Sequence, residues 1–326
     1  MIEVRDLVKR YGSHTAVDHL SFKVEKGQIY GFLGPNGAGK TTTMNIMTGY
    51  IGPTAGDVII NGHNILDEPE AVKRAIGYLP EQPPLYTDMT PLEYLDFAAE
   101  LKGLDKESRQ AAVDDVIGMT KIVAVKDRLI KNLSKGYKQR VGLAQAILGL
   151  PEIIILDEPT VGLDPKQILE IRELIRGLSK DHTILLSSHI LSEVQEICDH
   201  VLIIHEGHLV ASGTPAELEK QLTSHAVEMT VKGDDADSIR KLFSDIPDVV
   251  NVSCRLFAPG EVHVTVEAQG LADVRASLFY ACAAADKPIL MMRQSGVSLE
   301  DIFLKLTSEK PEAGDIHSSR KVGDAS

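Results

Sequence analysis

The stretch of residues 34–42 reads Gly34-Pro35-Asn36-Gly37-Ala38-Gly39-Lys40-Thr41-Thr42. It fits the pattern G-x-x-x-x-G-K-[ST], with an apolar run before it and a helical pattern after it. Its glycines allow the backbone to wrap closely around a phosphate, because a Cβ would block the required dihedral angles and the approach. Backbone N–H groups and the start of the following helix then offer positive partial charge to the anion. The stretch therefore predicts a nucleotide phosphate site.

Four side chains complete the predicted site. Lys40 adds a full positive charge toward the β- and γ-phosphates, and the Thr41 hydroxyl suits a Mg²⁺ ligand. Asp157 and Glu158 follow the apolar run 153–156, at the edge of a predicted sheet where ligands bind. Asp157 is suited to hold Mg²⁺ through water, and Glu158 to orient or deprotonate an attacking water. The alternative for the acidic pair is a structural role at a strand end.

Composition limits the classes of protein that the chain can belong to. Its 326 residues are 43% hydrophobic and 25% charged, as in an ordinary globular protein with more than one domain. The net charge of −13 is spread along the chain, so no nucleic acid partner is expected. Cys198, Cys254 and Cys282 lie far apart and predict free thiols in a reducing compartment. We expect neither a secretory signal nor a membrane span.

Hydrophobic periodicity predicts an α/β core over residues 1–220. Residues 2–8 and 17–24 alternate as antiparallel strands with one wet face would, and Tyr11 between them is placed to stack on a base. Buried strands at 153–156, 183–187 and 201–204 alternate with helices, which predicts a mostly parallel sheet. Helical patterns over about 85–150, with helices in 91–130 and from 134 to about 150, predict a helical subdomain.

The order of predicted strands and helices changes after residue 220. The order β-α-β-β-α-β predicts a small α+β, ferredoxin-like domain over 221–308, which includes a helix at 271–285 and a closing helix at 299–306. The polar tail 309–326 lacks periodicity, so it is expected to be disordered.

These segments together resemble the ATP-binding, or nucleotide-binding, subunit of an ABC transporter over residues 2–220. Gly162-Leu163-Asp164 resembles the D-loop of that family and Leu133-Ser134-Lys135-Gly136-Tyr137 its signature. The other matching segments are Tyr11 (the aromatic that stacks on adenine), 34–42 (Walker A), 153–158 (Walker B with its catalytic glutamate) and His189 (the switch histidine). The resemblance implies a P-loop ATPase core made of a mostly parallel sheet, an antiparallel β subdomain and a helical subdomain.

The chain departs from the family pattern in two places. The signature usually has glycine and then glutamine where this chain has Lys135 and Tyr137, but Ser134 and Gly136 are kept. In the usual Q-loop position stands Glu81, and Gln82 follows it, so the Mg²⁺ ligand there is Glu81 or Gln82.

The resemblance also implies an activity and partners. Two copies, or two paired ATPase subunits, would close head to tail around two ATP with Mg²⁺, each signature covering the other copy's ATP, and hydrolysis would reopen them. Separate transmembrane permease subunits would dock on residues 77–84 and 85–130, with the chain peripheral on the cytoplasmic side of the membrane. The chain is similar to ATPases of bacterial exporters that carry drugs, polymers or gliding-motility-related cargo.

Three other classes of protein fit the sequence less well. A soluble relative that acts on a partner such as the ribosome usually has two ATP domains or a coiled-coil insert, and neither occurs here. A GTPase or a small-molecule kinase would share the phosphate loop, but the chain has no Asn-Lys-x-Asp segment. A regulatory sensor that never hydrolyses its nucleotide is disfavoured by Glu158 and His189.

Overall fold

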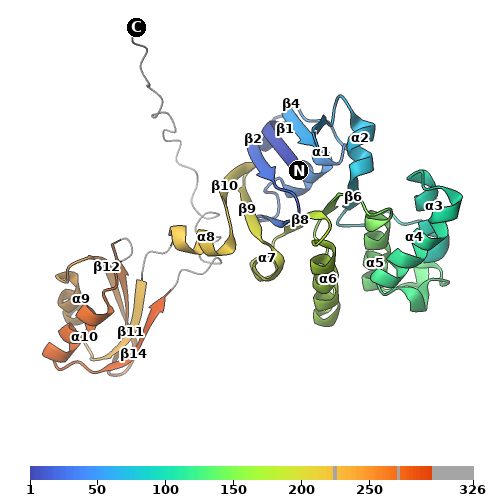
Figure 1. The fold of residues 1–326 in the computed structure, drawn as a ribbon. Helices are drawn as coiled ribbons and strands as arrows, with labels where there is room; N and C mark the ends of the chain where they lie inside the picture. Colours follow the sequence, from blue (N-terminus) through green and yellow to red (C-terminus); the bar gives the residue numbers. More distant parts are fainter. Residues whose placement is uncertain (223–225, 270–271, 296–326) are drawn as a thin grey trace, which may run out of the picture.

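The computed structural model describes residues 1–222, 226–269 and 272–295, which form three sheets with their helices (Figure 1). The helix expected at 299–306 and the tail 309–326 lie outside the described residues. Among the described helices, none combines the length and the apolar character that a membrane span needs. The three cysteines are free.

A six-stranded sheet forms the centre of the first part of the chain. Its order is β10-β9-β3-β8-β7-β6, and all neighbours are parallel except β10 and β9. The strands are β3 (Ile29–Leu33), β6 (Ile76–Leu79), β7 (Ile153–Leu156), β8 (Thr183–Ser188), β9 (His200–His205) and β10 (His208–Gly213). Every residue of β3, β7 and β8 is buried, as expected for strands with both faces covered. The mostly parallel sheet is therefore confirmed.

An antiparallel sheet of order β2-β1-β4-β5 lies beside it, made of β1 (Ile2–Tyr11), β2 (His14–Val24), β4 (Ala55–Ile60) and β5 (His63–Asn64). Helix α1 (Lys40–Met47) contributes Met44, Ile46 and Met47 to the hydrophobic core that this sheet shares with β3 and β7. This core fixes the phosphate loop, because α1 begins at the last residues of the loop. Helix α2 (Pro69–Ala75) leads into β6.

Three helices pack together next to the β6 edge of the six-stranded sheet. They are α3 (Pro91–Leu101), α4 (Lys106–Met119) and α5 (Lys135–Ile147) (Figure 1). Thr90 and Glu93 form a reciprocal capping box at the start of α3, and Asp105 caps α4. Two 3₁₀ turns, Val123–Val125 and Ile130–Asn132, connect α4 to α5. The other helices of this part are α6 (Pro165–Leu178), α7 (Leu191–Ile197) and α8 (Pro215–Leu222).

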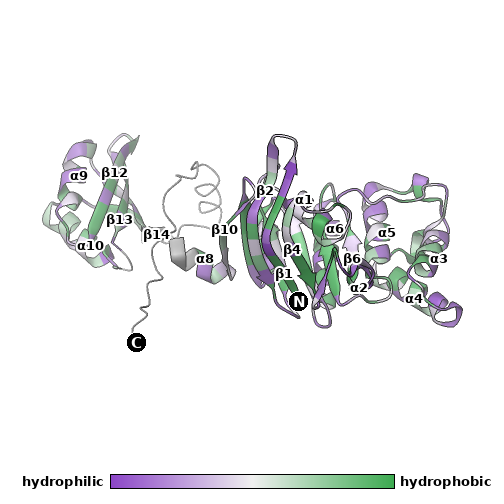
Figure 2. Cartoon of the chain, turned by 90° about the horizontal axis from the view of Figure 1, so that it is seen from above, coloured by the Kyte–Doolittle hydropathy of each residue, from purple (hydrophilic) through white to green (hydrophobic). Residues whose placement is uncertain are grey.

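The third sheet has the order β12-β13-β11-β14 and is antiparallel throughout. Its elements are β11 (Ala226–Lys232), α9 (Ala236–Ser244), β12 (Val249–Ala258), β13 (Glu261–Ala268), α10 (Arg275–Ala284) and β14 (Ile289–Ser295). The core between this sheet and its helices includes Met229, Phe243 and Leu278. Hydrophobic residues also lie along the strands of the sheet (Figure 2). Both the element order and the strand order are those of the predicted ferredoxin-like fold.

The structure differs from the sequence-based expectations mainly at element ends. Strand β1 runs on to Tyr11, so this residue closes a hairpin with a two-residue turn. Helix α1 ends at Met47 because Gly49 adopts a φ of +72°. Helix α10 begins at Arg275, four residues later than expected. These ends depend on backbone conformations that hydrophobic periodicity does not encode.

Candidate functional site

The phosphate loop connects β3 to α1 and is tightly enclosed by backbone. A Cβ at Gly34 would lie 2.5 Å from the carbonyl oxygen of Ile204, and a Cβ at Gly39 would lie 2.5 Å from that of Ala16. Gly39 also has a φ of +102°, which favours glycine. Within the loop the amide of Ala38 donates to the carbonyl of Pro35 at 3.1 Å. The loop is therefore held in shape by its neighbours.

A cavity of about 600 Å³ opens over this loop. It brings the hairpin, the phosphate loop and the ends of β6, β7 and β8 together. Its lining residues are Tyr11, His14, Ala16, Asn36, Gly37, Gly39, Lys40, Thr41, Thr42, Glu81, Glu158, Val161 and His189. The predicted residues Gly34, Pro35 and Ala38 belong to the loop but do not line the cavity.

The sequence reasoning missed His14, Ala16 and Val161 among the lining residues. His14 is paired with Tyr11 across the β1–β2 hairpin. That pairing was open to prediction from the Gly12-Ser13 turn, whereas the position of Val161 depends on the loop after β7. One part of the cavity lining is thus formed by residues that belong to none of the recognised motifs.

Lys40 is buried, with 6% of its surface exposed. Its Nζ donates to the carbonyls of Gly34 at 2.7 Å and Pro35 at 3.2 Å, and lies 3.7 Å from Oε1 of Glu158. Burial lowers the pKa of this ammonium, while the carboxylates of Glu158 and Asp157 act in the opposite direction. A buried cation that points into a cavity is suited to a polyanionic ligand.

Glu158 is held by contacts at both its backbone and its side chain. Its amide donates to Oγ of Ser187 at 2.8 Å, and its Oε2 lies 3.0 Å from Nδ1 of His189. Its φ is +48°, an uncommon conformation for a residue other than glycine. Such a conformation persists only where the surroundings impose it, and it is frequent at functional sites. The turn aims the carboxylate back over the phosphate loop.

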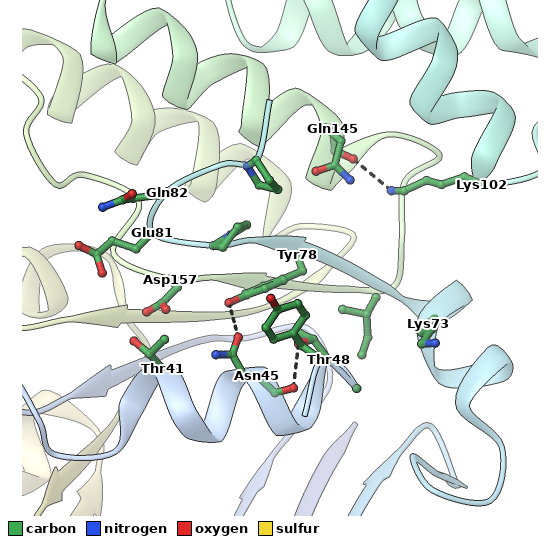
Figure 3. A pocket seen from close by; sticks show the side chains of 15 residues that line it. Thr41, Asn45, Thr48, Lys73, Tyr78, Glu81, Gln82, Lys102, Gln145 and Asp157 are labelled. Carbon is green, nitrogen blue, oxygen red and sulfur yellow. Dashed lines mark hydrogen bonds between the residues drawn. The ribbon is translucent and has the colours of Figure 1, made fainter. Parts of the chain in front are cut away.

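A second cavity, of about 760 Å³, lies beside the first, between α1 and the segment that carries Glu81 and Gln82 (Figure 3). Thr41 and Glu81 line both cavities, whereas Gln82 and Asp157 line only this second one. Of the two candidates at the Q-loop position, Glu81 is therefore the one that borders the cavity over the phosphate loop.

The residues at this junction fit a Mg²⁺ ion. Asp157 is fully buried, its Oδ1 accepts from Oγ of Ser187 at 2.5 Å, and its Oδ2 has no hydrogen-bond partner among the described residues. A buried oxygen left without a partner is costly unless something else binds it. Carboxylate and hydroxyl oxygens from Asp157, Glu81 and Thr41 are the ligand type that Mg²⁺ prefers. Within the described chain no group of three or more His, Cys, Asp or Glu could hold a metal ion, so a nucleotide would have to supply further ligands.

The predicted signature residues stand apart from this cavity. None of the residues 134–137, all of which are described, lines it. Ser134 caps α5, its Oγ accepting from the Tyr137 amide at 3.4 Å, and a Cβ at Gly136 would collide with the Gln167 side chain. Nζ of Lys135 lies against Gly162, and Tyr137 and Asp164 line a separate cavity of about 320 Å³. The signature segment therefore packs on the D-loop segment of its own chain.

A glycine-rich loop, a buried lysine and an acidic strand end around one cavity define a P-loop nucleotide-binding protein. Residues 17–161 match the family described as ABC transporter. The chain is 37% identical over 315 residues to the bacitracin transport ATP-binding protein BcrA of Bacillus licheniformis, covering 94% of this chain and 97% of that protein. It is 32% identical over 313 residues to the linearmycin resistance ATP-binding protein LnrL of Bacillus subtilis (94% and 98% covered).

A solved ATP-binding subunit of an ABC transporter superposes with a TM-score of 0.63 at 34% identity, covering 68% of this chain and 92% of that chain. The protein thus belongs to the family of ABC transporter ATP-binding proteins. It is an ATP-hydrolysing, energy-coupling subunit of a transporter, which confirms the sequence-based prediction. The relatives do not favour a role on the ribosome.

Proposed function

We propose that ATP occupies the 600 Å³ cavity, with its adenine on the Tyr11 ring and its phosphates in the loop 34–42. One face of the Tyr11 ring is covered by Lys9, whose Nζ lies 5.2 Å from the ring centre. The base would therefore stack on the other face, and the ring is 49% exposed. Lys40 would exchange its two carbonyl partners for phosphate oxygens, which are stronger acceptors.

The contact between Glu158 and His189 is the observation that carries the proposal. Glu158 would accept the proton of the attacking water, and His189 would keep the carboxylate oriented and contact the γ-phosphate. Thr41, Asp157 and Glu81 would hold Mg²⁺. Bound Mg²⁺ would neutralise charge that develops on the phosphates. Because the Glu158 side chain is 9% exposed, its oxygens are shielded from bulk water and strongly polarised by Lys40.

The position of the signature residues supports a pair of copies. Ser134, Lys135, Gly136, Tyr137 and Asp164 lie outside the cavity of their own chain. The N-terminus of α5, capped by Ser134, nevertheless carries partial positive charge that suits a phosphate. A second copy, turned head to tail, would bring this helix end to the γ-phosphate. We therefore propose a homodimer, or a pair with a related ATPase subunit, that closes around two ATP.

The second cavity offers a place for the membrane partner. It is lined by α1, by residues of the segment after β6, by Lys102 and by Gln145 of α5, and the Tyr50 residue that borders it is 79% exposed. An occupant would contact both the proposed Mg²⁺ ligands and α5, the signature helix, which begins within the signature segment. We propose that separate transmembrane permease subunits dock here, with the chain on the cytoplasmic face of the membrane. Since relatives are named for bacitracin transport and linearmycin resistance, we propose export of a drug-like compound.

A trapped dimer tests the paired arrangement. Glu158→Gln should bind ATP without hydrolysing it and run as a dimer on gel filtration at saturating ATP. Adding Ser134→Arg should restore the monomer while each copy still binds ATP, because a bulky cation would stand at the partner's γ-phosphate. The matched control is Asp115→Arg, which adds the same side chain on the exposed face of α4 and should leave the dimer intact. A monomer of Glu158→Gln at saturating ATP would contradict the proposal.

A further inference from the structure

Glu193 is a buried carboxylate to which the proposed reaction assigns no role. It lies on α7, the helix that follows His189, and 5% of its surface is exposed. Carboxylates are almost never this deeply buried unless they are paired and hydrogen-bonded. The contacts of Glu193 therefore show what it holds in place.

Three side chains from three different segments meet this carboxylate. Oγ1 of Thr160 donates to Oε2 of Glu193 at 2.6 Å, and Oγ of Ser188 lies 3.4 Å from the same oxygen. On the other side, a terminal nitrogen of Arg172 lies 3.7 Å from Oε1. Arg172 is on α6, which begins directly after Asp164.

Two of these segments carry the residues proposed to act on the water and the γ-phosphate. Thr160 comes two residues after Glu158 in a tight turn, where the amide of Val161 donates to the carbonyl of Glu158 at 3.2 Å. Ser188 comes directly before His189, and its Oγ accepts from the amide of Ile190 at 3.0 Å. Besides the bond from the Glu158 amide to Oγ of Ser187, the segments that carry Glu158 and His189 are thus linked a second time, through Glu193.

We propose that Glu193 is a positioning residue for ATP hydrolysis, which ties the loops after β7 and β8 together so that Glu158 and His189 stay in contact. The inference rests on the proposed roles of that pair. Without the carboxylate, the Thr160 hydroxyl would be buried without its partner, Arg172 would keep only Glu196, and the two loops would be linked only through Ser187. The active geometry tolerates little displacement, because a shift of about 1 Å at a reacting group lowers rates by about 100-fold.

The test is a comparison of kcat and KM for ATP among variants of the full chain. Glu193→Ala should lower kcat by about 30-fold and change KM by no more than about 3-fold, because no contact to the nucleotide cavity is removed. Glu193→Gln, whose amide oxygen still accepts from Thr160, should recover about a third of the wild-type kcat. Thr160→Val, a milder change that keeps the volume, should lower kcat by about 5-fold.

The matched control is Glu196→Gln. Glu196 lies on the same helix and pairs with the same Arg172, but its carboxylate is half-exposed and, among the described residues, no hydroxyl of the two loops bonds to it. Its kcat should stay within about 2-fold of wild type. If Glu196→Gln lowers kcat as much as Glu193→Gln, or if the loss in Glu193→Ala follows its loss of melting temperature, Glu193 has only a structural role.

The experiment distinguishes a failure of this inference from a failure of the proposed function. Glu158→Gln, measured in parallel, should lose hydrolysis whether or not Glu193 matters. Unchanged kcat in Glu193→Ala and Thr160→Val, next to an inactive Glu158→Gln, would overturn this inference alone. Full hydrolysis by Glu158→Gln would overturn the proposed function and this inference with it.

Discussion

Nδ1 of His189 lies 3.0 Å from Oε2 of Glu158, and this contact joins two residues that are 31 positions apart in the chain. They follow the parallel neighbours β7 and β8, which are in register from Ile153 and Thr183 onward. The other oxygen of Glu158 lies 3.7 Å from Nζ of Lys40. One carboxylate therefore has each of its oxygens beside a different group of the proposed site.

The two oxygens of Glu158 predict different results for its substitutions. Glu158→Gln keeps the shape but removes the proton acceptor, so kcat should fall by about 100-fold or more while ATP affinity changes little. Glu158→Asp keeps the charge but is one methylene shorter, so it should lose contact with His189 and retain a few per cent of kcat. Phosphate release at saturating ATP measures both. A Gln variant with a kcat above about a tenth of wild type would exclude Glu158 as the proton acceptor.

Tyr11 gives a test of base stacking. Tyr11→Phe keeps the ring and should leave the Kd for ATP within about 2-fold of wild type, whereas Tyr11→Ala should raise it by about 5- to 50-fold. Fluorescence titration with an ATP analogue measures the two affinities. The control is Tyr50→Ala, which removes another exposed tyrosine that lines only the second cavity. An unchanged Kd in Tyr11→Ala would place the base elsewhere.

Much of the fold was predictable because its signals are local. The buried strand Ile153–Leu156 was predicted to the residue, since a short apolar run bounded by Pro151 and Asp157 leaves little choice. The ferredoxin-like order of the last sheet followed from element order alone. The ends of α1 and α10 were less certain, because they depend on single backbone conformations.

The candidate site was predicted where a motif is continuous and missed where the contacts are distant in sequence. The loop 34–42 and Asp157 were assigned from neighbours in the chain. The contact of Thr160 with Glu193 spans 33 positions, and no local pattern indicates which of the acidic residues on α7 turns inward. The choice of Glu81 over Gln82 likewise depends on which side chain faces the nucleotide cavity.

The proposed domain boundary near residue 220 predicts an independent ATPase core. The hydrophobic cluster of the last sheet is drawn only from residues within 227–292, and none of these residues belongs to either of the other two clusters. A chain of residues 1–222 should therefore fold and keep basal hydrolysis within about 3-fold of the full chain. Circular dichroism and phosphate release measure both properties. A well-folded fragment with no hydrolysis would show that the last sheet contributes to the site.

Lys102 predicts a pH dependence of stability. Its Nζ donates to the carbonyls of Gln145 at 3.2 Å, Ala146 at 3.3 Å and Leu148 at 2.8 Å, at the C-terminal end of the signature helix (Figure 3). Burial lowers the pKa of this ammonium from 10.5 to about 8 in the folded chain. Between pH 8 and 10.5 the unfolded chain therefore binds more protons at this position than the folded chain does.

It follows that the free energy of unfolding should gain a positive contribution as the pH rises above 8. Lys102→Met removes the titrating group, so its urea-unfolding curves at pH 7.5 to 9.5 should lack this contribution, although the loss of three hydrogen bonds lowers its stability throughout. The control is Lys131→Met, which removes a half-exposed ammonium paired with Asp88 in the same helical part and should keep the wild-type slope. Equal slopes in wild type and Lys102→Met would mean that the ammonium stays charged in the folded chain, held by the helix carbonyls despite its burial.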